Sequence, residues 1–166
     1  MRIIAILVGH GQLPKDLPEE TRREYLVLKA KRDRTREEEE RYQELERKIT
    51  NWPRNQENDP YWSSINKLAK LLKERSSLDK VIPAFNEFCN PSLEKALEEA
   101  CKENCDRIIV IPTMLIPGGV HSEEEIPEAI ERIKLRCGCE IIYLWPFDIN
   151  EIANMLMAHI SKLADG

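Results

Sequence analysis

No apolar run in this sequence approaches the roughly 20 residues that a bilayer-spanning helix requires. The first residues also lack the form of a secretory signal, because Arg2 precedes only a strand-length apolar run and then Gly-His-Gly. Basic residues are not in excess: 25 Lys and Arg stand against 30 Asp and Glu, whereas a general nucleic-acid binder usually carries a basic face. These absences predict a cytoplasmic protein that binds neither membranes nor nucleic acid.

The cysteines form no C-x-x-C pair of the kind that zinc sites use. They number five, and an odd count without a secretory signal predicts reduced thiols. The simplest interpretation is that they are small buried apolar side chains, and a metal or cluster role is the alternative. The five are Cys89, Cys101, Cys105, Cys137 and Cys139.

Four continuous apolar runs predict the strands of a parallel sheet that is covered on both faces. Pro83 lies inside the second run and predicts an edge strand or a bulge there, because proline cannot donate a hydrogen bond to the sheet. Helical patterns separate the runs, so the order along the chain predicts an α/β fold with right-handed crossovers. The four runs are residues 2–8, 80–85, 106–112 and 139–144.

Three helices are predicted after the second, third and fourth strands. The first would begin with Asn90 as its N-cap and Pro91 in its first turn. The second would begin with Ser122, which would form a capping box with Glu125, and the third would begin with Asp148. The expected helical ranges are 91–104, 123–136 and 149–163.

The first crossover is much too long for one helix, since its regular helix starts only near Pro60. Roughly half of residues 17–60 are charged, with both signs mixed. Two helices are expected there, over 18–32 and 35–50, with a narrow apolar stripe that suits a hairpin touching one surface. We therefore expect a single domain over 1–166, in which 17–60 is a helical-hairpin insertion. The stripe consists of Tyr25, Leu28, Tyr42, Leu45 and Ile49.

Two of the three histidines each follow a predicted strand in a glycine-containing turn. His10 lies in residues 8–11 and His121 in residues 117–121. Because the carboxyl ends of parallel strands share one edge of a sheet, both imidazoles can face one cavity. Imidazole is a common ligand for Co²⁺, Ni²⁺, Fe²⁺ and Zn²⁺, and it exchanges a proton near neutral pH. The alternative is that each ring only hydrogen-bonds its own turn. His159, on the last helix, is expected to be a surface or packing residue.

Three motifs, in this order, resemble the short class II chelatases. These are the sirohydrochlorin cobaltochelatases, with relatives that load iron or nickel. The motifs are Gly9-His10-Gly11, residues 85–97 and residues 109–127. The resemblance covers the chain outside the predicted hairpin, and the combination of three motifs at successive strand ends is more specific than any one of them.

The resemblance implies a chelatase-like three-layer domain that pairs as a homodimer around a bilobed cleft. It implies insertion of a divalent metal, Co²⁺ first and Ni²⁺ or Fe²⁺ as alternatives, into the tetrapyrrole sirohydrochlorin, as in cobalamin or related biosynthesis. The metal is the substrate, and no organic cofactor is implied. The family's metal-site histidines correspond to His10 and His121, and its acidic residue corresponds to Glu87. Gln12 stands where the family usually has serine, and the hairpin is unusual.

The chemistry of metal insertion agrees with these residue types. The macrocycle must lose two pyrrole N–H protons while the metal loses its waters, and neutral imidazole is both a base and a ligand at pH 7. Two histidines and one carboxylate leave coordination positions open, whereas a closed four-ligand cage would trap the metal. Donors for the substrate's carboxylates would come from the strand-end turns and helix starts. These binding residues are Gly9, Gly11, Gln12, Gly118, Gly119 and Ser122.

Three features of the sequence allow more than one interpretation: the role of Glu87, the activity and the identity of the metal. Glu87 could instead cap or pair with the helix that follows it. A metal or tetrapyrrole carrier could use the same pocket without turnover. The sequence does not select the metal, because Co²⁺, Ni²⁺ and Fe²⁺ overlap in their preference for imidazole and carboxylate ligands.

Overall fold

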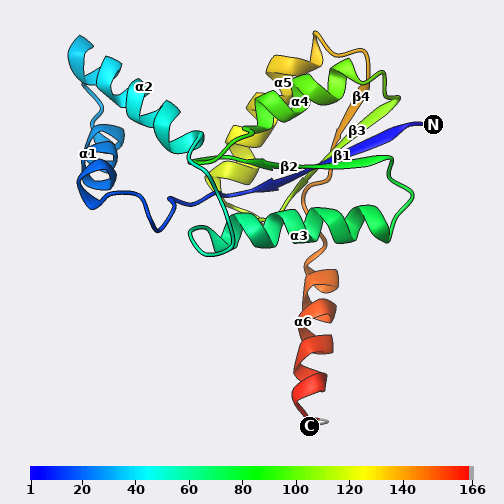
Figure 1. The fold of residues 1–166 in the computed structure, drawn as a ribbon. Coiled ribbons are helices and arrows are strands. Elements are labelled where there is room, and N and C mark those ends of the chain that lie inside the picture. Colours follow the sequence, from blue (N-terminus) through cyan, green and yellow to red (C-terminus); the bar gives the residue numbers. More distant parts are fainter. Residues whose placement is uncertain (165–166) are drawn as a thin grey trace.

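The computed structural model describes residues 1–164, and its centre is a four-stranded parallel sheet (Figure 1). The predicted α/β class is confirmed, and each strand lies within one residue of its expected bounds. Pro83 lies on the edge strand, as expected, because the strand order is β2-β1-β3-β4. The strands are β1 (Ile3–Gly9), β2 (Lys80–Phe85), β3 (Arg107–Pro112) and β4 (Glu140–Tyr143).

Helices cover the two faces of the sheet unequally. On one face, α4 (Leu93–Lys102) and α5 (Ile126–Lys134) pack over a core that includes the fully buried Ile108 and Val110 of β3. On the other face, α3 (Pro60–Glu74) packs mainly against β1 and β2, and Ile111 of β3 borders the same apolar cluster. Alternate residues of a strand point to opposite faces, so each strand contributes to both layers. The expected three-layer arrangement is therefore present, with α4 and α5 on one face of the sheet and α3 on the other.

Two predicted helix starts are wrong. Helix α4 is capped by Ser92, not Asn90, because the Pro91 carbonyl first accepts a hydrogen bond from the Phe85 N–H and keeps this segment beside β2. The predicted capping box of Ser122 and Glu125 is absent. Instead, a wide helical turn, His121–Glu125, precedes α5, and the Glu125 carboxylate is engaged by the ring of His121.

The predicted hairpin helices are present as α1 (Glu19–Ala30) and α2 (Arg36–Thr50), which extend from the carboxyl edge of the sheet (Figure 1). Their expected apolar stripe forms a small separate core in which Tyr25, Leu45 and Ile49 are buried. Phe88, from the loop after β2, packs edge-on against Tyr25 with ring centroids 6.1 Å apart. The hairpin therefore contacts the same loop that carries Glu87.

A buried ion pair fixes the segment between the hairpin and α3. The Arg54 guanidinium lies 2.6 Å from the carboxylate of Asp59, and both side chains are almost fully buried. Asp59 also accepts a hydrogen bond from Trp62 N–H and so caps α3, while Arg54 donates to the carbonyls of Ile49 and Phe88. The buried charges are thus paired and hydrogen-bonded, which is the condition under which burial is tolerated.

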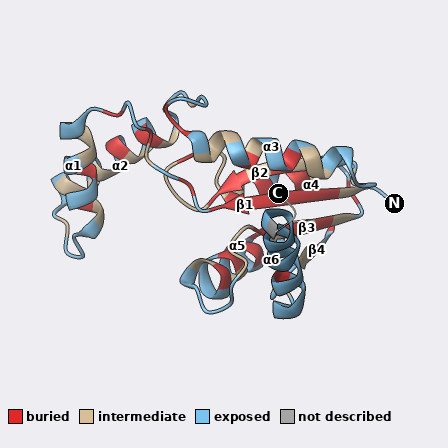
Figure 2. Cartoon of the chain, turned by 90° about the horizontal axis from the view of Figure 1, so that it is seen from below, coloured by how far each residue is buried: buried red, intermediate tan, exposed pale blue. Residues whose placement is uncertain are grey.

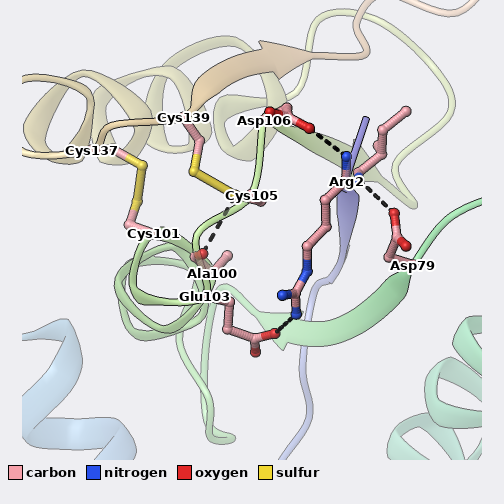
Figure 3. Close-up of a disulfide and its surroundings, with 10 residues drawn as sticks. Arg2, Asp79, Ala100, Cys101, Glu103, Cys105, Asp106, Cys137 and Cys139 are labelled. Carbon is pink, nitrogen blue, oxygen red and sulfur yellow. Dashed lines mark hydrogen bonds and ion pairs between the residues drawn. A yellow bond between two sulfur atoms is a disulfide. The ribbon is translucent and has the colours of Figure 1, made fainter.

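Four of the five cysteines form two disulfides, which corrects the expectation of reduced thiols (Figure 3). Cys101 and Cys105, at the end of α4 and just beyond it, bond to Cys137 and Cys139 in the segment before β4. The Cα–Cα distances of 5.3 and 5.8 Å lie in the range that disulfides require. Cys89 is free and buried, as the packing interpretation expected.

The last helix, α6 (Ile149–Ala164), starts where the sequence predicts, and the Asp148 carboxylate accepts from Asn150 N–H in its first turn. It projects away from the sheet (Figure 1), and nearly all of its surface is exposed (Figure 2). His159 is one of its exposed residues. None of the helices within residues 1–164 has both the length and the apolar character needed to cross a membrane.

Candidate metal centre

His10 follows the last residue of β1 directly. Its backbone N–H donates to the Tyr61 hydroxyl of α3 over a distance of 2.8 Å, which fixes the turn against the helix. Its ring Nδ1 lies 3.1 Å from the carbonyl oxygen of Gly11. A carbonyl only accepts, so Nδ1 carries the proton and Nε2 presents a lone pair. The carboxyl end of β1 therefore presents one metal-ligating nitrogen.

Glu87 lies in the loop after β2 and is held beside His10 by backbone hydrogen bonds. Its N–H donates to the carbonyl of His10 (3.0 Å), and the N–H of Asn86 donates to the carbonyl of Gly9 (3.0 Å). Gly11 has a φ of +94°, and a Cβ there would lie 1.9 Å from the carbonyl oxygen of Glu87. Only glycine fits this close approach, so Gly11 allows the two strand-end loops to meet.

His121 is oriented by an acidic neighbour one helical turn later. Its Nδ1 lies 2.5 Å from a carboxylate oxygen of Glu125, at i, i+4 along the helical turn. A carboxylate accepts this hydrogen bond from Nδ1–H, which leaves the lone pair on Nε2 of His121. Carboxylates that hold a histidine in this way fix its tautomer and its orientation toward a metal.

The two imidazoles converge on one point. Their Nε2 atoms are 3.0 Å apart, and the rings meet edge-on with centroids 4.5 Å apart. Two ligand nitrogens that each lie about 2.1 Å from a metal, at right angles, are about 3.0 Å apart. Because both Nδ1 atoms face acceptors, the two Nε2 lone pairs face each other. A cation bound between them would relieve their repulsion.

Glu87 completes the cluster. One ligating atom from each of His10, Glu87 and His121 lies within 4.8 Å of the others, and within residues 1–164 these three make up the one such group of His, Cys, Asp or Glu. The His10 side chain is 47 % exposed, so the group is open to solvent on one side. An open set of two imidazoles and one carboxylate suits a divalent metal that must both enter and leave.

The hairpin contributes a cation to this cluster. The Lys29 ammonium of α1 lies 2.6 Å from a carboxylate oxygen of Glu87 and 4.6 Å from the centre of the Phe88 ring. Arg22 of the same helix lines a cavity of about 470 Å³ beside His10 and Gln12. Glu87 thus forms its salt bridge with the hairpin, not with the following helix as the alternative interpretation expected.

The other residues predicted to bind substrate differ in their exposure. Gly9 packs tightly, since a Cβ there would lie 3.1 Å from the side chains of Ile65 and Tyr61. Gly118 and Gly119 lie in open space, and the Gly118 N–H donates to the Glu123 carboxylate (3.0 Å). Ser122 is fully buried, and its hydroxyl has no hydrogen-bond partner within residues 1–164. The buried position of Ser122 removes it from the accessible donors of the turn.

Sequence reasoning missed Glu125 and Lys29 as neighbours of the cluster. Glu125 carried a usable signal, its i, i+4 spacing from His121, which was hidden by the assumption that the helix starts after Ser122. Lys29 carried none, because 58 residues separate it from Glu87 and only the docking of the hairpin brings the two together.

A family model described as CbiX matches residues 57–163, which begin after the hairpin. A sirohydrochlorin cobaltochelatase of Methanopyrus kandleri is 30 % identical over 66 residues, covering 40 % of this chain and 46 % of that protein. One of Sulfurisphaera tokodaii is 33 % identical over 96 residues, covering 57 % of this chain and 75 % of that protein. The aligned part is thus about half the length of the first relative and three quarters of the second.

Solved structures share the fold. A putative cobalamin biosynthesis CbiX protein from Marinobacter aquaeolei superposes with a TM-score of 0.56 at 18 % identity, over 98 % of this chain and 96 % of that one. The sirohydrochlorin chelatase SirB from Bacillus subtilis subspecies spizizenii, in complex with cobalt, gives 0.55 at 20 % identity, over 98 % of this chain and 50 % of that one. The whole of this chain thus corresponds to half of the larger protein.

Proposed function

Because this chain belongs to the CbiX family, we propose that it inserts a divalent metal into sirohydrochlorin. Two similar proteins bear the name sirohydrochlorin cobaltochelatase, which supports Co²⁺ as the first metal to test. SirB from Bacillus subtilis has been solved with cobalt and with Fe³⁺, so iron is tested beside cobalt. Ni²⁺ is the third candidate, since the ligand types suit all three metals.

One observation carries the proposal: the Nε2 atoms of His10 and His121 meet at 3.0 Å at the carboxyl edge of the sheet. Their Nδ1 atoms are occupied by the Gly11 carbonyl and the Glu125 carboxylate, so the Nε2 lone pairs are free for a metal. Glu87 adds a negative charge beside them. Neutral ligands with a single carboxylate bind a divalent ion without enclosing it.

The same groups serve the proton transfer. Insertion removes two N–H protons from the macrocycle as the metal forms bonds to its four nitrogens. Each of the two imidazoles, once it has released the metal, would regain its lone pair and accept one of the two protons, and both protons would then pass to solvent through the exposed side of the cluster. Glu125 stabilises the imidazolium of His121 through the hydrogen bond at Nδ1.

The activity test is an anaerobic assay with sirohydrochlorin and each of Co²⁺, Ni²⁺ and Fe²⁺. The visible spectrum of the macrocycle should change faster with the protein than without it, and one protein should convert many macrocycles. Product limited to one equivalent per chain would indicate a metal or tetrapyrrole carrier instead. No acceleration with any of the three metals would exclude the chelatase.

The two strand-end histidines should be essential to this turnover. His10→Ala and His121→Ala should each reduce kcat by about 10²–10⁴, the usual cost of losing a catalytic base or ligand. His159→Ala, on the exposed face of α6, is the matched control and should leave kcat unchanged. A near-normal rate in either strand-end variant would remove that histidine from the mechanism.

We also propose that two copies of the chain act together. The carboxyl edge of one sheet provides a single wall beside His10 and His121, whereas a large flat macrocycle needs a wall on each side. That this chain corresponds to half of SirB supports the same arrangement, in which a second copy stands in for the other half.

A further inference from the structure

Helix α1 of the hairpin carries two cations on the side that meets the metal centre, and the salt bridge with Glu87 uses only one of them. Lys29 makes that salt bridge, and Arg22 precedes it by about two helical turns, so both project from the same side of α1. The side chain of Arg22 is only 29 % exposed, whereas the next residue, Arg23, is exposed to solvent. Arg22 is therefore held against the protein, close to the cluster but outside it.

The charge of Arg22 is not neutralised by a close carboxylate. In the part of the chain that the structure describes, its guanidinium makes one hydrogen bond, from Nη2 to the carbonyl oxygen of Pro14 over 2.8 Å. The carboxylate of Glu19 lies 3.8 Å from Nε, and the Glu19 side chain is itself 74 % exposed. An exposed ion pair contributes little, so the guanidinium retains its charge and further N–H donors for a ligand.

Arg22 lines the same cavity as the candidate metal ligand His10. The cavity has a volume of about 470 Å³ and lies between the turn after β1, the loop after β2 and α1. The buried Arg54 donates to the carbonyls of Gln12 and Phe88, and so holds the turn and the loop together. A ligand in this cavity would meet a fixed pocket with an arginine beside the metal centre. The lining residues are His10, Gly11, Gln12, Leu13, Arg22 and Phe88.

We propose that Arg22 binds a carboxylate side chain of the macrocycle and thereby places the ring nitrogens at His10 and His121. This inference rests on the proposed function, because it takes sirohydrochlorin as the substrate. Sirohydrochlorin carries its carboxylates on the rim and its four nitrogens at the centre, so a contact at the rim fixes where the centre lies. A planar guanidinium matches a carboxylate through two parallel hydrogen bonds, which fixes direction as well as position. Lys29 is less suited to this role, because its ammonium already donates to Glu87.

The first test is the binding of metal-free sirohydrochlorin, followed by the change in its visible absorbance. Arg22→Met should raise the dissociation constant about tenfold or more, the cost of losing a hydrogen-bonded charge pair. Arg23→Met removes the same charge from the neighbouring exposed position and should leave the constant unchanged. Arg22→Lys keeps the charge without the planar fork, and its constant should lie between those of the wild type and Arg22→Met.

Three results of this titration would contradict the account. If Arg22→Met binds the macrocycle as tightly as the wild type, or if the two methionine variants weaken binding equally, the inference is wrong and the proposed function stands. If Arg22→Lys binds no better than Arg22→Met, charge at this position is not what holds the carboxylate, and the inference is again wrong. A wild type that binds no sirohydrochlorin would refute the proposed function itself.

The second test separates substrate binding from support of the fold. Arg22→Met should raise KM for sirohydrochlorin about tenfold or more and leave kcat within about twofold, because the contact is the same before and during metal insertion. Co²⁺ alone should bind Arg22→Met no more weakly than the wild type, since the guanidinium contacts none of His10, Glu87 and His121. Weaker Co²⁺ binding, or a loss of kcat without a rise in KM, would show that Arg22 supports the cluster and would overturn the inference.

Discussion

At the scale of single residues, the contact between Lys29 and Glu87 should set how tightly the candidate metal centre binds a metal. A cation from the hairpin lies 2.6 Å from the one carboxylate of the cluster, so a metal at the two imidazoles must share or displace it. Two positive charges competing for one carboxylate weaken the binding of the metal. Weak binding is useful where the metal has to be passed on.

Replacing Lys29 should therefore strengthen metal binding. In Lys29→Met, the Co²⁺ dissociation constant should fall about fivefold, which corresponds to the 1 kcal/mol that a partly exposed ion pair is worth. Calorimetric titration of the apoprotein measures this constant. Lys31→Met removes a neighbouring ammonium that pairs with Glu38 and should have no effect. Equal or weaker binding in Lys29→Met would show that the ammonium does not oppose the metal.

Some features of the site depend only on neighbouring residues in the sequence and could be predicted, whereas others depend on contacts formed in the folded chain. His10 and His121 were predictable, because an apolar strand followed by a glycine turn places a side chain at a known edge of a parallel sheet. Their tautomers were not predictable, since these depend on the Gly11 carbonyl and on Glu125. Ser122 was expected to be an exposed donor and is buried, because the helical turn starts at His121.

At the scale of elements, strands were predicted more accurately than helix starts. Continuous apolar runs mark strands buried on both faces, whereas a helix start depends on contacts across the fold. Pro91 illustrates this dependence, because its carbonyl pairs with the Phe85 N–H and delays α4 until Ser92. The disulfides were missed because the cysteine count was interpreted without knowing that the end of α4 lies beside residues 137–139.

The cysteines should show two classes of reactivity, the free Cys89 and the four disulfide-bonded cysteines. Burial raises the pKa of the Cys89 thiol to about 11, so its thiolate is scarce at pH 8 and iodoacetamide should not modify the native protein. After denaturation without reductant, one label per chain is expected, and after reduction five. Intact-mass spectrometry counts the labels. Five labels without reductant would contradict both disulfides.

The hairpin should be separable from the core. It has its own small apolar core, and the Arg54–Asp59 pair that caps α3 lies beyond α2. Replacing residues 19–50 with a Gly/Ser linker should leave a folded protein, with altered KM because Lys29 and Arg22 leave the cluster and its adjacent cavity. Circular dichroism and steady-state kinetics measure the two effects. Loss of folding would make the hairpin part of the core and refute its description as an insertion.

At the scale of the whole molecule, a single chain forms only one wall of the proposed active site. The candidate metal centre opens to solvent at one edge of the sheet, and most residues of α6 within the described part of the chain are exposed. The proposed pairing of two chains would provide a second wall for a macrocycle. The sequence predicted α6 itself and could not predict its direction; in the structure Tyr143, Trp145 and Phe147 contact one another in the segment before this helix.

In the proposed function, His10 and His121 bind the same metal ion. X-ray absorption at the cobalt edge of the Co²⁺-loaded protein counts the imidazoles bound to the metal. The account predicts two imidazoles in the wild type and one in each of His10→Ala and His121→Ala. Two imidazoles in either variant, or none in the wild type, would contradict it.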